Sequence, residues 1–218
     1  MGIAATVWVG HFHRNGIDYF RSHANAVQLG DVGEKQMPGD QEPHLAVRTN
    51  LPRGALRIES ATQIELHGVA ISGSDIGASL AISGVGLLSA SSVARQLEDQ
   101  ALCLVRLGAS PQAMVEAANR APEVIAELVR IGVHGRLVHQ VLVILEMTTA
   151  LNFTRATRFE AGGARDSCVV TGIVGGSRTV VALTPGTTFA YLLLKPAWDA
   201  KQPTKHIEAW ADDPWRPY

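Results

Sequence analysis

The sequence predicts an α+β fold with a central, twisted and mainly antiparallel sheet, and three changes of pattern predict it. Apolar and polar residues alternate from Leu56, helical spacing replaces this alternation after Ser110, and alternation returns from Leu137. Strands, then helices, then strands again is the order typical of α+β domains.

Composition restricts the class of protein. The 218 residues are 46% apolar and only 18% charged, which suffices for one sizeable core. The net charge of -1 argues against nucleic acid as a partner. No apolar run reaches about 18 residues and the N-terminus lacks signal-peptide features, so we expect a cytoplasmic location. Cys103 and Cys168 lie in apolar surroundings, which fits a reducing compartment.

The first strand-patterned region runs from Leu56 to Leu107. Alternation continues to His67, and Gly68 then shifts its phase as a bulge would. The stretch that follows is rich in Gly, Ala and Ser, which pack poorly in an ordinary sheet. The apolar strand positions predicted here are Ile64, Leu66, Val69, Ile71, Ile76, Leu80 and Ile82.

Two helices are predicted in the middle of the chain. Ser110 supplies an N-cap and Pro111 the first helical position of one helix. The other begins near Pro122 and is stopped by Gly132. The apolar residues at helical spacing are Met114, Val115 and Ala118 in the first helix, and Val124, Ile125, Leu128 and Val129 in the second.

The second strand-patterned region begins at Leu137, and we expect strand as far as Phe159. Further strands are predicted over 169–174, 179–183 and 188–194, separated by Gly175-Gly176 and by Pro185-Gly186. The apolar strand positions singled out here are Val141, Val143, Leu151, Phe153, Val169, Ile173, Val181 and Leu183.

Both ends of the chain carry a further signal. Between Trp8 and His23, basic residues stand among aromatic ones, a mixture suited either to an anionic membrane surface or to a solvated helix face. After a predicted domain over 1–195, a tail over 196–218 carries three tryptophans and is either a latch docked on the body or a frayed terminus. The basic residues are His11, His13, Arg14 and Arg21, and the tryptophans are Trp198, Trp210 and Trp215.

The order of these segments resembles the pore-forming domain of the gasdermin family over residues 25 to 195. The similar segments are Val27 to Glu34 with the Pro- and Gly-containing loop to Pro43, Leu56 to Leu107, the approach from Glu127 to Gln140, and the two stretches Val141 to Arg158 and Thr179 to Tyr191. The last two resemble the family's second long hairpin, and Leu56 to Leu107 resembles its first.

The resemblance implies a protein that binds acidic inner-leaflet lipids, oligomerises and inserts two β-hairpins per subunit into the plasma membrane, causing lytic cell death. It assigns membrane insertion to the apolar strand positions above, whereas lipid contact by the four basic residues is expected from their basic and aromatic setting alone. It also implies a homo-oligomer, or a mixed ring with a related variant, and activation by a protease or by such a partner. The alternative from the residues alone is a β-rich binding or assembly module with an inert sheet.

Catalytic interpretations are weak, and we expect no enzyme, no cofactor and no metal. His11 and His13 lack a third ligand at a suitable spacing, so a surface pair is the simpler interpretation. The glycines of 172–176 precede a strand pattern, whereas a phosphate-binding loop requires a helix there. Cys168 lacks a recognisable nucleophile context and is expected to be a strand cysteine.

Overall fold

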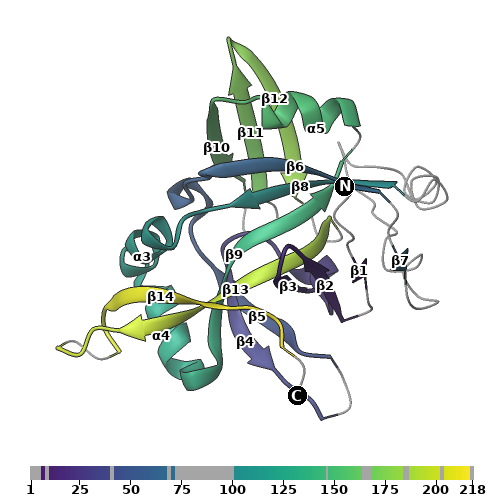
Figure 1. The fold of residues 1–218 in the computed structure, drawn as a ribbon. Coiled ribbons are helices and arrows are strands. Elements are labelled where there is room, and N and C mark those ends of the chain that lie inside the picture. The colour runs from purple at the N-terminus through teal and green to yellow at the C-terminus, as the bar shows by residue number, and fades with distance from the viewer. Residues whose placement is uncertain are drawn as a thin grey trace.

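A computed structural model describes residues 6–7, 10–39, 42–67, 70–71, 101–145, 147–163, 168–183, 187–201 and 204–216. It shows a mixed α+β fold with a mainly antiparallel sheet (Figure 1). In chain order the elements are β1 (Thr6–Val7), β2 (His11–Arg14), β3 (Ile17–Phe20), η1 (Ala24–Ala26), β4 (Asp31–Gln36), β5 (His44–Asn50), η2 (Arg53–Ala55), β6 (Ser60–His67), β7 (Ala70–Ile71), β8 (Ala101–Gly108), α3 (Pro111–Asn119), α4 (Pro122–Ile131), η3 (Gly132–His134), β9 (Gly135–Ile144), α5 (Met147–Thr154), β10 (Arg158–Gly162), β11 (Cys168–Val174), β12 (Ser177–Leu183), β13 (Thr188–Trp198) and β14 (Ile207–Asp213).

Four neighbouring strands organise the large sheet. β6 pairs with β8, β8 with β9, and β9 with β13, and every pairing is antiparallel. We call these four strands the ribbon. The pairs His67–Ala101 in β6–β8 and Val143–Thr188 in β9–β13 lie at the same end of it. The segments 68–100 and 145–187 therefore both leave the ribbon at that one end.

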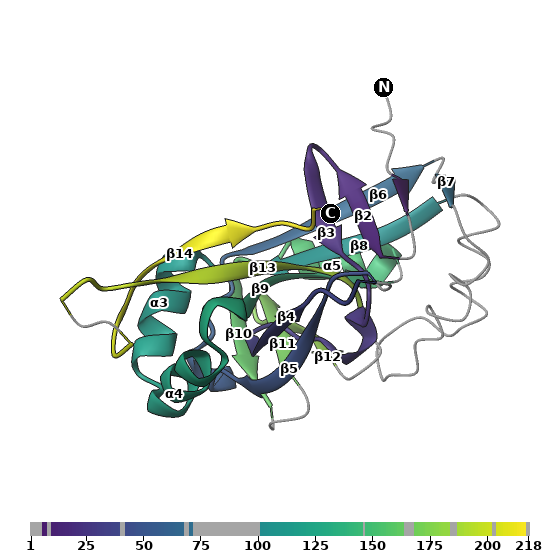
Figure 2. The ribbon, with the colours of Figure 1, turned by 90° about the horizontal axis from the view of Figure 1, so that it is seen from below.

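The ribbon is covered on both faces. On one face the main core includes Val105, Val141 and Leu193, together with residues of α3, α4, α5 and the three-stranded sheet β10–β11–β12. The opposite face buries a separate set, among them Leu104 and Leu142. The β2–β3 hairpin lies on that side in Figure 2. Such burial on both faces explains the nearly continuous apolar sequence of β9.

The two central helices form as predicted. The Ser110 hydroxyl accepts a hydrogen bond from the Ala113 amide at 3.2 Å and caps α3. Gly132 follows α4 with a φ of 74°, a conformation that glycine adopts without strain. The predicted stripe of α4 is wrong at Val129, which is exposed, whereas Val124 and Leu128 are fully buried.

The predicted strand from Leu137 to Phe159 is wrong after Ile144, because helix α5 interrupts it. Leu151 and Phe153 would share one face of a strand, but residues two apart lie on nearly opposite sides of a helix. Phe153 is fully buried in the core, and Leu151 is exposed. Similarly, the strand expected from Leu56 begins only at Ser60, and Leu56 and Ile58 are buried in the core ahead of it without belonging to a strand.

Gly172 of β11 provides a test of how tightly α5 docks. A Cβ at Gly172 would lie 2.9 Å from the Ala156 Cβ and 3.2 Å from the Phe153 ring, so Gly172→Ala must displace the end of α5. We expect a loss of about 1–3 kcal/mol in the free energy of unfolding, measured by urea denaturation. Gly162→Ala in β10 is the matched control, because its Cβ would meet nothing within 4 Å. Equal stability of the two variants would contradict this packing.

Candidate functional sites

The N-terminal segment is a β-hairpin, so the predicted alternative of a solvated helix face is wrong. β2 and β3 pair directly, and Asn15 and Gly16 form the turn with φ values of 51° and 76°. Two residues with positive φ are characteristic of the tight turns that match the twist of antiparallel strands. Ring contact between Phe12 and Phe189 of β13, with centroids 5.5 Å apart, packs the hairpin on the sheet.

The four basic residues do not form one exposed surface. Arg21 is buried with its guanidinium 4.6 Å from the centre of the Phe189 ring, and burial lowers its pKa to about 10. His13 Nδ1 lies 2.7 Å from the Asp18 carboxylate across the hairpin. Arg14 and His11 are half-buried, and burial is the main cause that lowers the pKa of each. Arg21 is therefore not available to a membrane surface in this state.

The tail is an ordered part of the sheet. β14 pairs antiparallel with β13, and Trp210 lies opposite Pro196. Trp210 and Trp215 are buried, whereas Trp198 is half-buried and belongs to β13 itself. β13 therefore crosses the predicted boundary at 195/196, and the docked part of the tail lies beyond it. The expected alternative of a frayed terminus is wrong for residues 204–216.

Asp213 anchors the tail through two cations, the buried Arg136 and the largely buried Lys35. Its carboxylate accepts hydrogen bonds from Lys35 Nζ of β4 at 3.0 Å and from Arg136 Nε of β9 at 2.5 Å. Burial raises the pKa of Asp213, but the hydrogen bonds from Arg136 and Lys35 outweigh it, so the pKa lies below its usual value. Three segments distant in sequence are thus joined by one carboxylate.

The end of the tail rests on the N-terminal hairpin. The Trp215 ring stacks on His11 with centroids 3.7 Å apart and an interplanar angle of 9°. The Trp215 amide also donates a hydrogen bond of 3.0 Å to the Asp18 carbonyl. The structure thus joins two groups that the sequence singled out separately, the basic and aromatic N-terminus and the tryptophans of the tail.

The predicted membrane-inserting residues lie in several environments. Val141 and Val143 are fully buried in β9. Ile64 and Leu66 lie in β6, and Ile71 lies in β7. Leu151 and Phe153 lie in α5, as described above. Val69, Ile76, Leu80 and Ile82 fall outside the described residues.

The remaining four of these residues belong to the β11–β12 hairpin and do not share a face. Val169 pairs with Ala182 and Ile173 with Arg178, whereas Val181 pairs with Val170. Cross-strand partners share a face and successive residues alternate, so Val169 and Ile173 lie opposite Val181 and Leu183. Only Val181 and Leu183 are buried. In this register the four residues cannot all face lipid.

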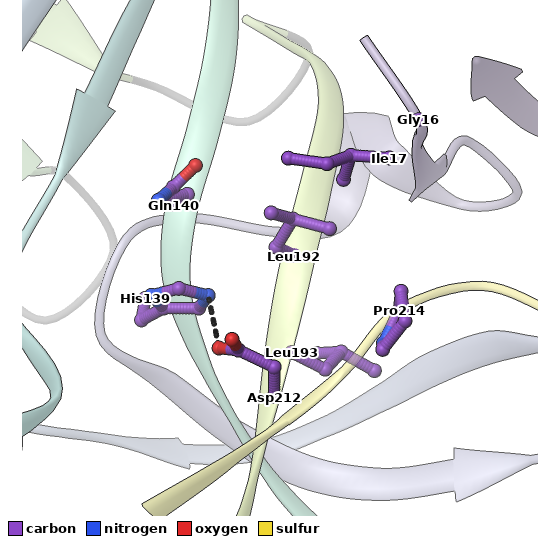
Figure 3. Close-up of a pocket in the computed structure, with 8 residues that line it drawn as sticks. All are labelled: Gly16, Ile17, His139, Gln140, Leu192, Leu193, Asp212 and Pro214. Carbon is purple, nitrogen blue, oxygen red and sulfur yellow. Dashed lines mark ion pairs between the residues drawn. The ribbon is translucent and has the colours of Figure 1, made fainter. Parts of the chain in front are cut away.

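A pocket that the sequence did not predict lies between the tail and the body (Figure 3). It has a volume of about 190 Å³ and is lined by residues of the β2–β3 turn, β9, β13 and the tail. His139 of β9 is buried with Nε2 3.9 Å from the carboxylate of Asp212. Burial lowers the pKa of His139 to about 4 against the opposing influence of Asp212 and Ala109, so the ring is neutral at pH 7. No local motif marked these residues, because they meet only through strand pairing.

In the part of the chain that the structure describes, no three His, Cys, Asp or Glu residues gather as a metal site would require. The helices of that part are too short or too polar for any to cross a membrane. Cys103 and Cys168 are buried free cysteines in strands, as predicted for Cys168. Comparison of the chain with family models, curated proteins and solved structures finds no match.

Replacing Asp213 by Asn leaves the buried Arg136 and the largely buried Lys35 without their counter-charge. We expect Asp213→Asn to lower the free energy of unfolding by about 3–5 kcal/mol in urea denaturation. Asp212→Asn is the matched control: the Asp212 side chain is 79% exposed against 20% for Asp213, and we expect its change to cost less than about 1 kcal/mol.

The same anchor predicts a pH dependence. Because the folded-state pKa of Asp213 lies below its unfolded value, the stability that it contributes is present above the unfolded pKa of about 3.9 and is lost as the pH falls through the folded pKa. The difference in stability between the chain and Asp213→Asn should therefore be constant from pH 7 to 5 and shrink below pH 4. A difference that already shrinks between pH 7 and 5 would contradict the assignment.

Proposed function

We propose that this protein is a pore-forming protein of the gasdermin kind, which binds acidic membrane lipids, oligomerises and inserts β-hairpins into the membrane. The observation that supports it best is the ribbon, in which two strand pairs, β6–β8 and β9–β13, lie side by side with their connecting segments at the same end. If both segments extend as hairpins from that end, each subunit supplies four adjacent antiparallel strands. Closing such sheets into a ring leaves no backbone edge in lipid.

The composition of the first connecting segment supports the proposal. From residue 68 to residue 94, Asp75 is the one charged residue, and small side chains predominate. A membrane-spanning strand needs about 9–11 residues, so 68–100 is long enough for two spanning strands and a turn. The low charge matters because a charged side chain at the bilayer midplane costs about 2–4 kcal/mol in a barrel.

The second connecting segment needs a larger rearrangement. It carries α5 and β10–β12, and insertion requires Phe153, Val170 and Leu183 to leave the core. Continuing the β9–β13 register past Val143 and Thr188 puts the turn near residues 165–166, so insertion must also replace the β11–β12 pairing, whose turn is at Gly175 and Gly176. In this proposal, lipid replaces the core as the apolar surroundings of these residues, so much of the apolar burial is exchanged rather than lost.

We propose that the docked tail restrains oligomerisation and membrane binding. β14 occupies one edge of β13, which is an edge of the ribbon, and Trp215 covers His11 of the predicted lipid-binding set. Release of the tail, by cleavage near Lys201 or Lys205 or by a partner, would expose the edge of β13 and the His11 ring. The partners are then an acidic phospholipid membrane at the inner face of the plasma membrane and further copies of this chain or a related variant. No catalytic function is proposed.

The first test is dye release from liposomes. We expect the protein, or a form cleaved after Lys205, to release dye from vesicles containing phosphatidylserine and not from vesicles of phosphatidylcholine alone. A protein inert on both at micromolar concentration and low salt would favour the alternative, a binding or assembly module with an inert sheet.

A matched pair of substitutions in segment 68–100 tests, in the same assay, which side chains face lipid. Leu80→Asp places a charge on the side that we predict to face lipid and should abolish dye release, whereas Ser79→Asp places it on the lumen side and should be tolerated. The opposite ranking would contradict the predicted register.

The tail gives a separate prediction. Replacing Trp210 and Trp215 together by alanine removes two buried rings, each of which stabilises docking by about 2–3 kcal/mol, and should increase leakage of phosphatidylserine vesicles. Glu208→Ala, at an exposed position of the same strand, is the control and should leave leakage unchanged. Unchanged or reduced leakage in the double variant would mean that the tail does not restrain the protein, and control would have to come from a second protein.

A further inference from the structure

The pocket between the tail and the rest of the domain has the properties of a binding site. Ile17, His139 and Leu192 of the body and Asp212 and Pro214 of the tail line it. Figure 3 shows their side chains arranged around one space, with the dashed line joining His139 to Asp212. The volume of about 190 Å³ exceeds that of an engineered 150 Å³ cavity that holds benzene, so a single aromatic ring with a short substituent fits.

The polar side chains of this pocket are those of Asp212, His139 and Gln140. Asp212 is the charged residue among those that line it, because His139 is neutral at pH 7. The side-chain oxygen of Gln140 is buried without a hydrogen-bond partner. A buried acceptor without a donor is costly, and rotation of the Gln140 amide toward the pocket would let a ligand donate the missing hydrogen bond. The rest of the wall is apolar and includes Leu192, Leu193 and Ile17.

We propose that this pocket binds a small organic cation, an ammonium group attached to an aromatic or branched aliphatic body. The ammonium group donates a hydrogen bond to the Asp212 carboxylate, and a second to the Gln140 oxygen once the Gln140 amide turns toward the pocket, while the apolar body packs on Leu192, Leu193 and Ile17. An anion of the same shape would be repelled by Asp212, and a neutral isostere would lack the charge-assisted hydrogen bond.

Binding at this place is coupled to the docking of the tail. Asp212 and Pro214 belong to the tail, whereas the other lining residues belong to the body, so the complete pocket exists only while the tail is docked. A ligand that binds only the docked state shifts the equilibrium toward it. That such a ligand would also restrain pore formation rests on the proposed function, but the binding itself does not.

The test compares three probes of one shape at pH 7 without membranes: benzylammonium, benzyl alcohol and benzoate. In an NMR titration we expect benzylammonium to bind most tightly and benzoate most weakly, with shifts at the methyl groups of Ile17, Leu192 and Leu193. Benzylammonium should also slow hydrogen exchange of the β14 amides. Binding that shows no preference for the cation, or shifts confined to other residues, would overturn the proposal.

Two variants separate the charge from the cavity. Asp212→Asn, at an exposed side chain, should weaken benzylammonium binding by roughly two- to fivefold and leave benzyl alcohol unchanged. Leu192→Phe fills the pocket and should abolish binding of all three probes, and its unchanged far-ultraviolet spectrum would show that the fold is intact. Equal affinity of Asp212→Asn and the unmodified chain for benzylammonium would contradict the role of the carboxylate. Because membranes are absent, failure here leaves the leakage experiments unaffected.

Discussion

The pairing of β9 is the constraint on which the rest of the structure depends. This strand has β13 along one edge and β4 and β8 along successive parts of the other, and the apolar side chains of both its faces are buried. Its backbone groups are thereby satisfied by neighbouring strands, which a buried strand requires. β6 pairs with the free edge of β8. The two long connecting segments, 68–100 and 145–187, therefore leave the sheet at the same end. The helices then cover one face, and the β2–β3 hairpin covers the other.

The tail acts on this arrangement at several places. β14 satisfies part of the outer edge of β13, an edge that would otherwise be a template for pairing with another chain. Asp213 joins β14 to β4 and β9, and Trp215 joins the tail to the β2–β3 hairpin. Docking of the tail is thus coupled to the edge of the ribbon, to its central strand and to the hairpin on its second face. A change in the tail therefore bears on three surfaces that lie far apart in the sequence.

Local signals in the sequence predicted the fold class and several elements. The cap at Ser110 and the turn at Gly175-Gly176 depend on neighbouring residues, and both are confirmed. Helix α5 was missed because Thr148 and Thr149 favour strand, and its stability comes from burial of Ala150 and Phe153 in the core. The contacts of Asp213 with Lys35 and Arg136, 178 and 77 residues away, leave no local pattern. The pocket and the Trp215–His11 stack were missed for the same reason, since they are made by pairing between distant strands.

The most direct measurement is a cryo-electron microscopy structure of the protein on vesicles containing phosphatidylserine. We expect a ring in which β6–β8 and β9–β13 keep their present pairings, such as Gln63 with Val105 and Val141 with Tyr191, while 68–100 and 145–187 continue the four strands through the bilayer. We also expect that α5 is absent and that β14 has left β13. A membrane-bound form in which α5 remains packed on β6 and β8, or in which the four strands have exchanged partners, would contradict the proposed insertion.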